Sequence, residues 1–183
     1  MNILRYVILA IGTIAWFTPF PIYYTRGARG QLTKDYSARW GILLESVAYV
    51  LLWQGHFWLH TPARWQIALS VIFFALAAIT SWTASIALGR YLRVDAALDT
   101  EHELIRSGPY RFIRNPVYTS MLCVDIATAL LITPLWLFLI ALAVFLTGTT
   151  IRIRAEERLL AARFGPQFTE YRRAVSRLIP FVL

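Results

Sequence analysis

The sequence predicts an all-α integral membrane protein, a single domain over residues 1–183 with about five transmembrane helices. Apolar residues make up 58% of the chain and charged residues 15%, whereas soluble domains average roughly 45–50% and about 25%. The apolar residues form long runs that a soluble core of this size could not bury. The basic residues gather in the segments between these runs, which gives the predicted bundle an orientation.

Five runs are apolar enough to be membrane spans, each of which needs about 20 residues, with a range of roughly 17–25. They cover residues 3–24, 40–60, 65–88, 117–132 and 135–151. The first run could be a signal peptide, but no convincing cleavage site precedes Pro19 and the run is long enough to span. Only Thr133 and Pro134 separate the last two runs, so we expect a tight helical hairpin with the proline at the bend.

The charge distribution predicts the topology. The net charge is +8, and 16 of the 18 Lys and Arg residues lie in 25–39, 89–116 and 152–183, with only Arg5 and Arg64 on the opposite side. Basic segments face the cytoplasm, so we expect the N-terminus outside and the C-terminus inside. A nucleic-acid partner is disfavoured because no soluble basic domain remains once the apolar runs are removed; an anionic lipid leaflet accounts for the charge.

The segment 152–183 is predicted to be an amphipathic helical tail on the cytoplasmic side. Charged and apolar residues alternate with helical periodicity from Ile153 to Phe164. Gly165-Pro166 should end this helix, and a second short helix can follow. The single cysteine, Cys123, excludes an intrachain disulfide framework and a cysteine-based metal cluster, and no metal site is expected.

Polar residues that could support chemistry occur in two places. One is the segment 101–118, where Pro116 can begin a helix and leave free N–H groups beside Arg114, a favourable place for an anionic group. The alternative is that its arginines only anchor the helix at the lipid headgroups. The other is the pair Glu156 and Glu157, which could bind a ligand or only form ion pairs with neighbouring arginines.

These segments carry a family resemblance. GPYRFIRNPVYTS, a predicted hairpin, AEERLL and FGPQFTEYRRAVSRLIPF follow one another in this order. The combination resembles the isoprenylcysteine carboxyl methyltransferase family of membrane methyltransferases, with its phospholipid N-methyltransferase relatives. Their pattern is Gly-Pro-Tyr, Arg-His-Pro-x-Tyr, a hydrophobic stretch and Glu-Glu. The similarity covers roughly the last hundred residues, and the first two runs carry no signature.

The resemblance implies S-adenosylmethionine as cofactor, in a cytoplasmic pocket between the 89–116 loop, the hairpin and the tail. The residues implied to contact it are His102, Leu104, Gly108, Pro109, Tyr110, Arg114, Asn115, Tyr118 and Glu156. Catalytic roles are implied for Glu157, Arg172 and Arg173, with an arginine orienting an anionic substrate. Asn115 replaces the family histidine; asparagine still donates and accepts hydrogen bonds but does not titrate near neutral pH.

Three residues are candidates for a substrate pocket. Asp125 lies inside the fourth run, and intramembrane carboxylates usually face a cavity or a partner. Trp82 and Tyr91, at the cytoplasmic end of the third run, could line a substrate tunnel or pack in the core.

The function implied by the resemblance is carboxyl methylation of an isoprenylcysteine-like acid that enters from the bilayer. Methylation of a phospholipid headgroup nitrogen is the alternative. A non-catalytic transporter or assembly factor that kept the fold is the rival of another class, and the absence of an inverted repeat argues against a transporter. The oligomeric state is left open.

Overall fold

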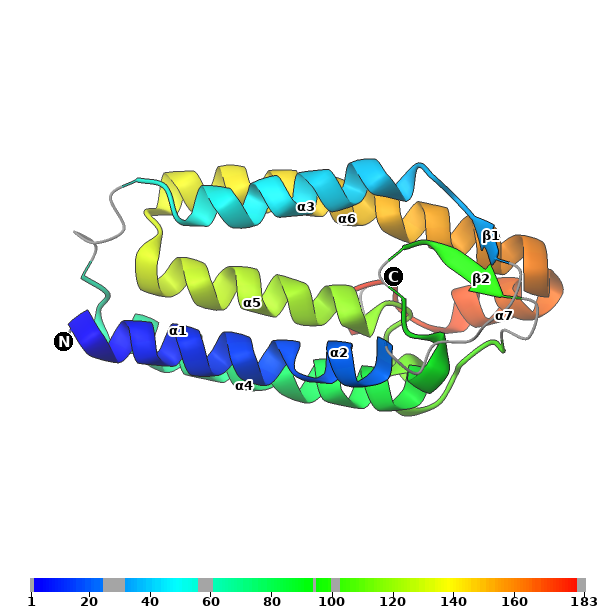
Figure 1. Ribbon diagram of the computed structural model, residues 1–183, viewed down its shortest axis with the longest axis horizontal. Helices are drawn as coiled ribbons and strands as arrows, with labels where there is room; N and C mark the ends of the chain where they lie inside the picture. The colour runs from blue at the N-terminus through cyan, green and yellow to red at the C-terminus, as the bar shows by residue number, and fades with distance from the viewer. Residues whose placement is uncertain (1, 25–31, 56–60, 94, 100–102, 181–183) are drawn as a thin grey trace.

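The computed structural model describes residues 2–24, 32–55, 61–93, 95–99 and 103–180. The protein is an elongated helical bundle with the N-terminus at one end and the C-terminus toward the other (Figure 1). The helices are α1 Asn2–Phe17, α2 Pro19–Tyr24, α3 Ala38–Leu52, α4 Arg64–Leu88, α5 Pro116–Ile132, α6 Leu135–Phe164 and α7 Pro166–Ala174. Short 3-10 helices cover η1 Gly89–Tyr91 and η2 Gly108–Arg111, and two strands cover β1 Leu32–Lys34 and β2 Ala97–Asp99.

Three helical segments are long and apolar enough to cross a membrane: Ile3–Tyr23, Arg64–Tyr91 and Leu135–Phe164. The prediction of a helical membrane protein is therefore confirmed. The other two expected spans are shorter helices of 15 residues in α3 and 17 in α5. α3 ends at Leu52, before the expected end of its run, and residues 56–60 of that run lie outside the described part of the chain.

The helices form two groups. α3 packs along α6, while α5 packs along α4, which also contacts α1 (Figure 1). One core cluster includes Leu9 of α1, Phe74 of α4 and Leu131 of α5. α5 and α6 were expected to form a tight hairpin; they are separated only by Thr133 and Pro134, but each packs chiefly against a different helix.

The α3–α6 contact depends on two glycines. A Cβ atom added to Gly148 would lie 2.7 Å from the Gly41 carbonyl oxygen, and one added to Gly41 would lie 2.6 Å from the Gly148 carbonyl oxygen. Distances this short leave no room for any side chain. Small residues that let two backbones approach closely are a common basis of helix association in membranes.

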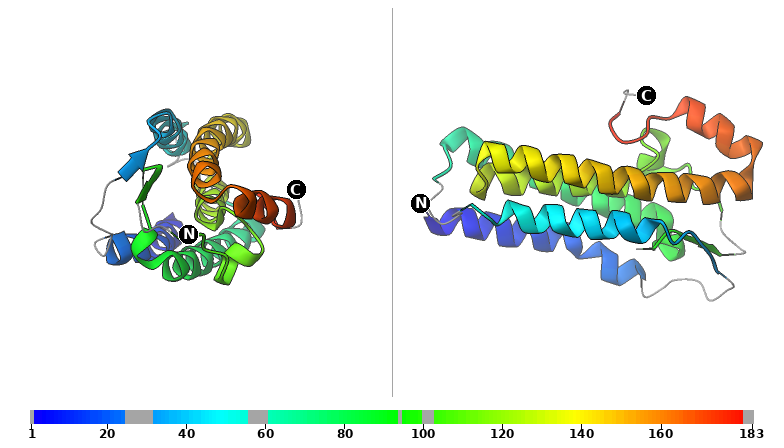
Figure 2. Two further views of the ribbon diagram at one scale, coloured as in Figure 1. Left: turned by 90° about the vertical axis from the view of Figure 1, so that its right-hand side faces the viewer. Right: turned by 90° about the horizontal axis from the view of Figure 1, so that it is seen from above.

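α6 is continuous through the expected boundary between the last span and the tail. Its 30 residues correspond to about 45 Å, longer than the roughly 30 Å hydrocarbon core. The tail therefore begins as an extension of a membrane helix, which Figure 2 shows from above. The helix ends at Gly165, which has a φ of +50°, and α7 follows from Pro166.

Two segments expected to be loops pair as strands. β1 and β2 are antiparallel, with Leu32 opposite Asp99 and Lys34 opposite Ala97. An ion pair of 3.0 Å between Lys34 and Asp95 adjoins them. The all-α prediction is thus corrected by a two-stranded sheet, which covers the end of the bundle where the polar segments gather (Figure 1).

We predict that Gly148→Val destabilises the protein, because its side chain must displace the α3 backbone. Overpacking of this kind costs about 1–3 kcal/mol, and thermal unfolding in detergent measures it. The control is Ala143→Val on the exposed side of the same helix, which should leave the unfolding midpoint nearly unchanged. Equal midpoints for the two variants would contradict the close α3–α6 contact.

Candidate functional site

A polar pocket lies at the end of the bundle that carries the strands. Its space, including the open mouth, is about 750 Å³. It is lined by Leu88, Tyr91, Leu92, Arg93, Asp95, Ala97, Leu98, Tyr110, Arg114, Asn115, Val117, Tyr118, Arg152, Glu156, Leu159 and Leu160. The walls therefore come from the end of α4, β2, the η2–α5 connection and the extension of α6. Six residues singled out from the sequence meet here: Tyr91, Tyr110, Arg114, Asn115, Tyr118 and Glu156.

Glu156 presents a carboxylate in the wall of this pocket. It accepts a hydrogen bond from the Tyr118 hydroxyl. The Arg152 guanidinium lies 4.8 Å from the centre of the Tyr118 ring and forms an ion pair of 2.6 Å with Glu45. The Tyr118 side chain thus contacts both the Glu156 carboxylate and the Arg152 guanidinium, and Arg152 is paired in turn with Glu45.

Tyr110 contributes a second aromatic ring to the pocket. Burial, together with the nearby Glu156 carboxylate, raises the pKa of Tyr110 well above its usual value, so its hydroxyl stays protonated. The backbone carbonyl of Tyr110 accepts a hydrogen bond of 2.7 Å from the Tyr171 hydroxyl. Burial raises the pKa of Tyr171 to about 12, so this donor keeps its proton at any physiological pH.

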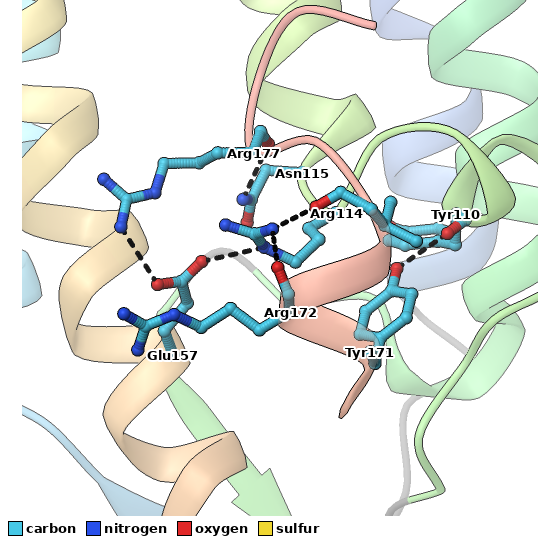
Figure 3. A network of polar contacts seen from close by, with 8 residues as sticks. Tyr110, Arg114, Asn115, Glu157, Tyr171, Arg172 and Arg177 are labelled. Carbon is cyan, nitrogen blue, oxygen red and sulfur yellow. Dashed lines mark hydrogen bonds and ion pairs between the residues drawn. The ribbon is translucent and has the colours of Figure 1, made fainter. Parts of the chain in front are cut away.

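Arg114 and Asn115 fasten the C-terminal tail to the pocket (Figure 3). Arg114 Nη1 donates to the carbonyl oxygens of Arg172, at 2.7 Å, and of Val175. Asn115 Nδ2 donates to the Arg177 carbonyl oxygen at 2.9 Å. We call these contacts the tail latch. At position 115 they need only an N–H donor that does not have to titrate, which asparagine supplies.

Glu157 contacts residues of the tail latch and is not among the described residues that line the polar pocket. It is buried and forms ion pairs with Arg114 at 3.2 Å and with Arg177 at 3.4 Å (Figure 3). Successive residues of an α-helix point about 100° apart, so the two adjacent glutamates of α6 serve different surroundings. The sequence pattern marked both residues but did not separate their roles.

The expected catalytic arginines lie outside the pocket. Arg172 lines a separate surface hollow with Glu157, together with Arg154, Arg158, Ala161 and Arg177. Arg173 lies in a shallow depression along α7. Neither is among the described residues that line the polar pocket, so this geometry does not favour direct contact with reacting groups.

Three further residues expected to contact a cofactor shape the site without lining it. Leu104 packs against the cluster of Phe168, Tyr171 and Val175. Gly108 has a φ of +58° and begins η2 with Pro109, so these two residues form the turn that carries Tyr110. His102 lies outside the described residues.

An apolar groove adjoins the polar pocket. It is lined by Trp16, Phe17, Phe20, Pro21, Leu92, Arg93, Val117, Met121 and Arg152. Leu92, Arg93, Val117 and Arg152 also line the polar pocket, so the two spaces meet at these residues. The sequence reasoning missed Arg152 and the aromatic residues of α1 and α2. The sequence held a signal for each: Arg152 lies one helical turn before Glu156, and three aromatic residues fall within the five positions 16–20.

The three residues expected to form a substrate pocket lie in different parts of the structure. Tyr91 lines the polar pocket. Trp82 instead donates a hydrogen bond of 3.0 Å to the Ala15 carbonyl oxygen and so joins α4 to α1. Asp125 is fully buried in α5 and, within the described chain, lines neither the pocket nor the groove.

The comparisons with known proteins agree with this arrangement. Residues 65–167 match the family described as phospholipid methyltransferase. Protein-S-isoprenylcysteine O-methyltransferase B of Arabidopsis thaliana is 28% identical over 144 residues, which cover 76% of this chain and 70% of the relative. The A form from the same plant is 28% identical over 156 residues, 82% of this chain and 76% of the relative. The Saccharomyces cerevisiae protein-S-isoprenylcysteine O-methyltransferase is 31% identical over 84 residues, 46% of this chain and 35% of the relative.

The matched segment extends from the start of α4 to the start of α7 and contains every described residue that lines the polar pocket. The three relatives are named as methyltransferases that act on isoprenylcysteine. The apolar helices place the protein in a membrane. The chain therefore belongs to the phospholipid methyltransferase family and is a membrane methyltransferase.

Proposed function

We propose that the protein transfers a methyl group from S-adenosylmethionine to the carboxylate of a lipophilic acceptor of the isoprenylcysteine type. The observation that carries this proposal is the junction of a polar pocket with an apolar groove at Leu92, Arg93, Val117 and Arg152. A water-soluble donor and a lipid-like acceptor need two such spaces that meet where the methyl group is transferred. The names of the relatives support an oxygen as the acceptor atom, and the family resemblance implies that this oxygen belongs to a carboxylate.

The chemistry of the polar pocket fits the proposed cofactor. S-adenosylmethionine carries an ammonium group, a sulfonium, ribose hydroxyls and an aromatic base. Glu156 offers an acceptor for the ammonium group or the hydroxyls, and Tyr91 and Tyr110 offer aromatic surface. Leu159 and Leu160 supply apolar surface on the same side as Glu156.

The reaction needs alignment more than proton transfer. The donor supplies an activated methyl group: one O–C bond forms as one S–C bond breaks, the charges of carboxylate and sulfonium cancel, and no proton is released. A site that excludes water favours such cancellation, and fixed geometry lowers the entropic part of the barrier. Arg93 and Arg152 at the junction offer positive charge to an anionic acceptor.

The tail has a supporting part in this proposal. The tail latch holds α7 and the residues after it against the segment between η2 and α5, and Glu157 forms an ion pair with Arg114 there. Glu157 and the Arg172 backbone carbonyl would then act by holding the tail in place, and no contact of the described residues gives Arg173 a part in this. The cytoplasmic orientation of this end remains the one that the charge distribution predicts.

A phospholipid headgroup is the second candidate acceptor, favoured by the description of the matched family. Its nucleophile would be an amine nitrogen, and its phosphate could be received by the same two arginines.

We predict that Glu156→Gln weakens binding of S-adenosylhomocysteine about ten- to a hundredfold. The variant loses a charge-assisted hydrogen bond worth about 1.5–3 kcal/mol, and calorimetric titration of the detergent-solubilised protein measures the change. Glu157→Gln is the matched control: it should lower the unfolding temperature through the latch but leave the affinity within about threefold. Equal affinity of wild type and Glu156→Gln would contradict the site.

The acceptor atom can be identified by the stability of the product. We expect membranes that contain the protein and methyl-labelled S-adenosylmethionine to yield a lipid-extractable product whose label is released by mild base, because a carboxyl methyl ester hydrolyses readily. A product whose label survives base would be an amine and would favour the phospholipid alternative.

The orientation can be tested with single cysteines in a Cys123→Ala background. Thr61→Cys and Ser107→Cys lie at exposed positions in segments expected on opposite sides of the membrane. We expect an impermeant maleimide to label Thr61→Cys in intact cells and Ser107→Cys only after permeabilisation. The reverse pattern would invert the proposed topology.

A further inference from the structure

We propose that the surface hollow between α6 and the tail binds the phosphate of an anionic phospholipid headgroup. Its space, including the open mouth, is about 590 Å³. Most of its lining residues are arginines, in the set Arg154, Glu157, Arg158, Ala161, Arg172 and Arg177. We call this space the arginine hollow. It shares no described lining residue with the polar pocket, so the lipid bound here is not the methyl acceptor and the inference goes beyond the proposed function.

The carboxylates at the arginine hollow already have partners. Glu157 forms ion pairs with Arg114 at 3.2 Å and with Arg177 at 3.4 Å. Since Arg177 belongs to the tail, the second of these pairs joins α6 to the tail through an anionic group. Arg158 is paired at 2.7 Å with Asp35, which does not line the hollow. Neither carboxylate is therefore left for a further arginine.

Two arginines of the hollow lack a counter-ion. Among the described residues, the exposed side chains of Arg154 on α6 and Arg172 on α7 have no hydrogen-bond or ion-pair partner. Arg154 also precedes Arg158 by four positions, a spacing at which like charges repel on a helix. The Arg172 and Arg177 side chains extend toward the same side as the Glu157 carboxylate (Figure 3). The fold thus brings cations of α6 and of the tail to one hollow without an anion for either Arg154 or Arg172.

The arginine hollow lies at the level of the lipid headgroups. Arg154 is about 29 Å along the helix axis from Leu135, the first residue of α6. This distance is close to the roughly 30 Å thickness of the hydrocarbon core. Ile179, two positions after Arg177, exposes 50% of its surface, so an apolar side chain accompanies the cations. A leaflet that contains anionic lipids supplies phosphate groups at this depth.

Phosphate matches the chemistry of these two guanidinium groups. A guanidinium forms paired N–H···O bonds with phosphate oxygens, a geometry that an ammonium group does not offer. A phosphate held between Arg154 and Arg172 would join α6 to α7, as Glu157 joins α6 to Arg177. A choline or ethanolamine headgroup would bring a further cation into a positive hollow. We therefore expect binding of a lipid with net negative charge, which strengthens the attachment of the tail.

The test is thermal unfolding of the full-length protein in a nonionic detergent with added dioctanoyl phosphatidylglycerol. We expect this lipid to raise the unfolding midpoint by about 3 °C or more, because a ligand that binds only the folded state stabilises it. Dioctanoyl phosphatidylcholine at the same concentration should leave the midpoint within about 1 °C. Arg154→Gln/Arg172→Gln should lose most of the shift, since both unpaired guanidinium groups are gone.

The matched control is Arg64→Gln/Arg111→Gln, which removes two exposed arginines that do not line the hollow. This variant should keep the full shift. If Arg154→Gln/Arg172→Gln does not yield folded protein, Arg154→Lys/Arg172→Lys keeps the charge without the paired geometry and should lose about half of the shift. A full shift in the lysine variant would count against the site.

Three results would overturn the proposal. One is a wild-type midpoint that phosphatidylglycerol does not move. Another is an equal loss of the shift in both glutamine variants, which indicates diffuse attraction of charges. The third is a shift with inorganic phosphate as large as the shift with the lipid at equal concentration, which would make a free anion the occupant. None of these results bears on methyl transfer, so the proposed function is tested separately.

Discussion

The close contact between α3 and α6 is the constraint on which the site depends. Gly41 and Gly148 bring the two backbones together, and the Glu45–Arg152 ion pair lies next to this contact. An ion pair in such a setting carries a large desolvation cost and persists only with good geometry and further hydrogen bonds. Thr149 supplies one of them. Helix packing and the electrostatics of the pocket are therefore parts of one arrangement.

Two kinds of space meet beside this arrangement. The polar pocket gathers tyrosines and a carboxylate, while the groove presents aromatic side chains of α1 and α2. The tail latch fastens the C-terminal tail to Arg114 and Asn115, which lie in the pocket wall and contact backbone carbonyls of the tail. Carbonyl oxygens accept the same hydrogen bonds whatever side chains the tail carries. Most of the chemical identity of the site thus resides in the α4–α6 region.

The sequence predicted the membrane class and the family, because apolar runs and ordered motifs are local signals; of its five predicted spans, three coincide with helices long and apolar enough to cross a membrane. It also marked Tyr110, Arg114, Asn115, Tyr118 and Glu156, which all line the pocket. The different roles of Glu156 and Glu157 depend on which side of α6 each residue faces, and the sequence pattern did not separate them. Two adjacent glutamates can be told apart only when the residues that surround each of them in the fold are known.

Other features could not be read from the chain because they depend on contacts between distant segments. Glu45 and Arg152 are 107 positions apart, and nothing local connects them. The β1–β2 pair joins two segments whose polar composition indicated loops. The main packing partners of α5 and α6, which are α4 and α3 respectively, also come from distant parts of the chain. Each of these contacts depends on packing between segments far apart in the chain, which local sequence patterns do not encode.

The continuity of α6 links the pocket to the thickness of the bilayer. A single rod of 30 residues carries both the apolar span and the Arg152–Glu156 wall, so the wall keeps a fixed distance from the membrane-embedded end of the helix. Bilayers differ in thickness by a few ångströms among membranes, and helices respond by tilting or by local adjustment of the lipid. Any such adjustment shifts the pocket relative to the headgroups as a unit. We therefore expect the depth of the pocket in the membrane to change with the thickness of the bilayer.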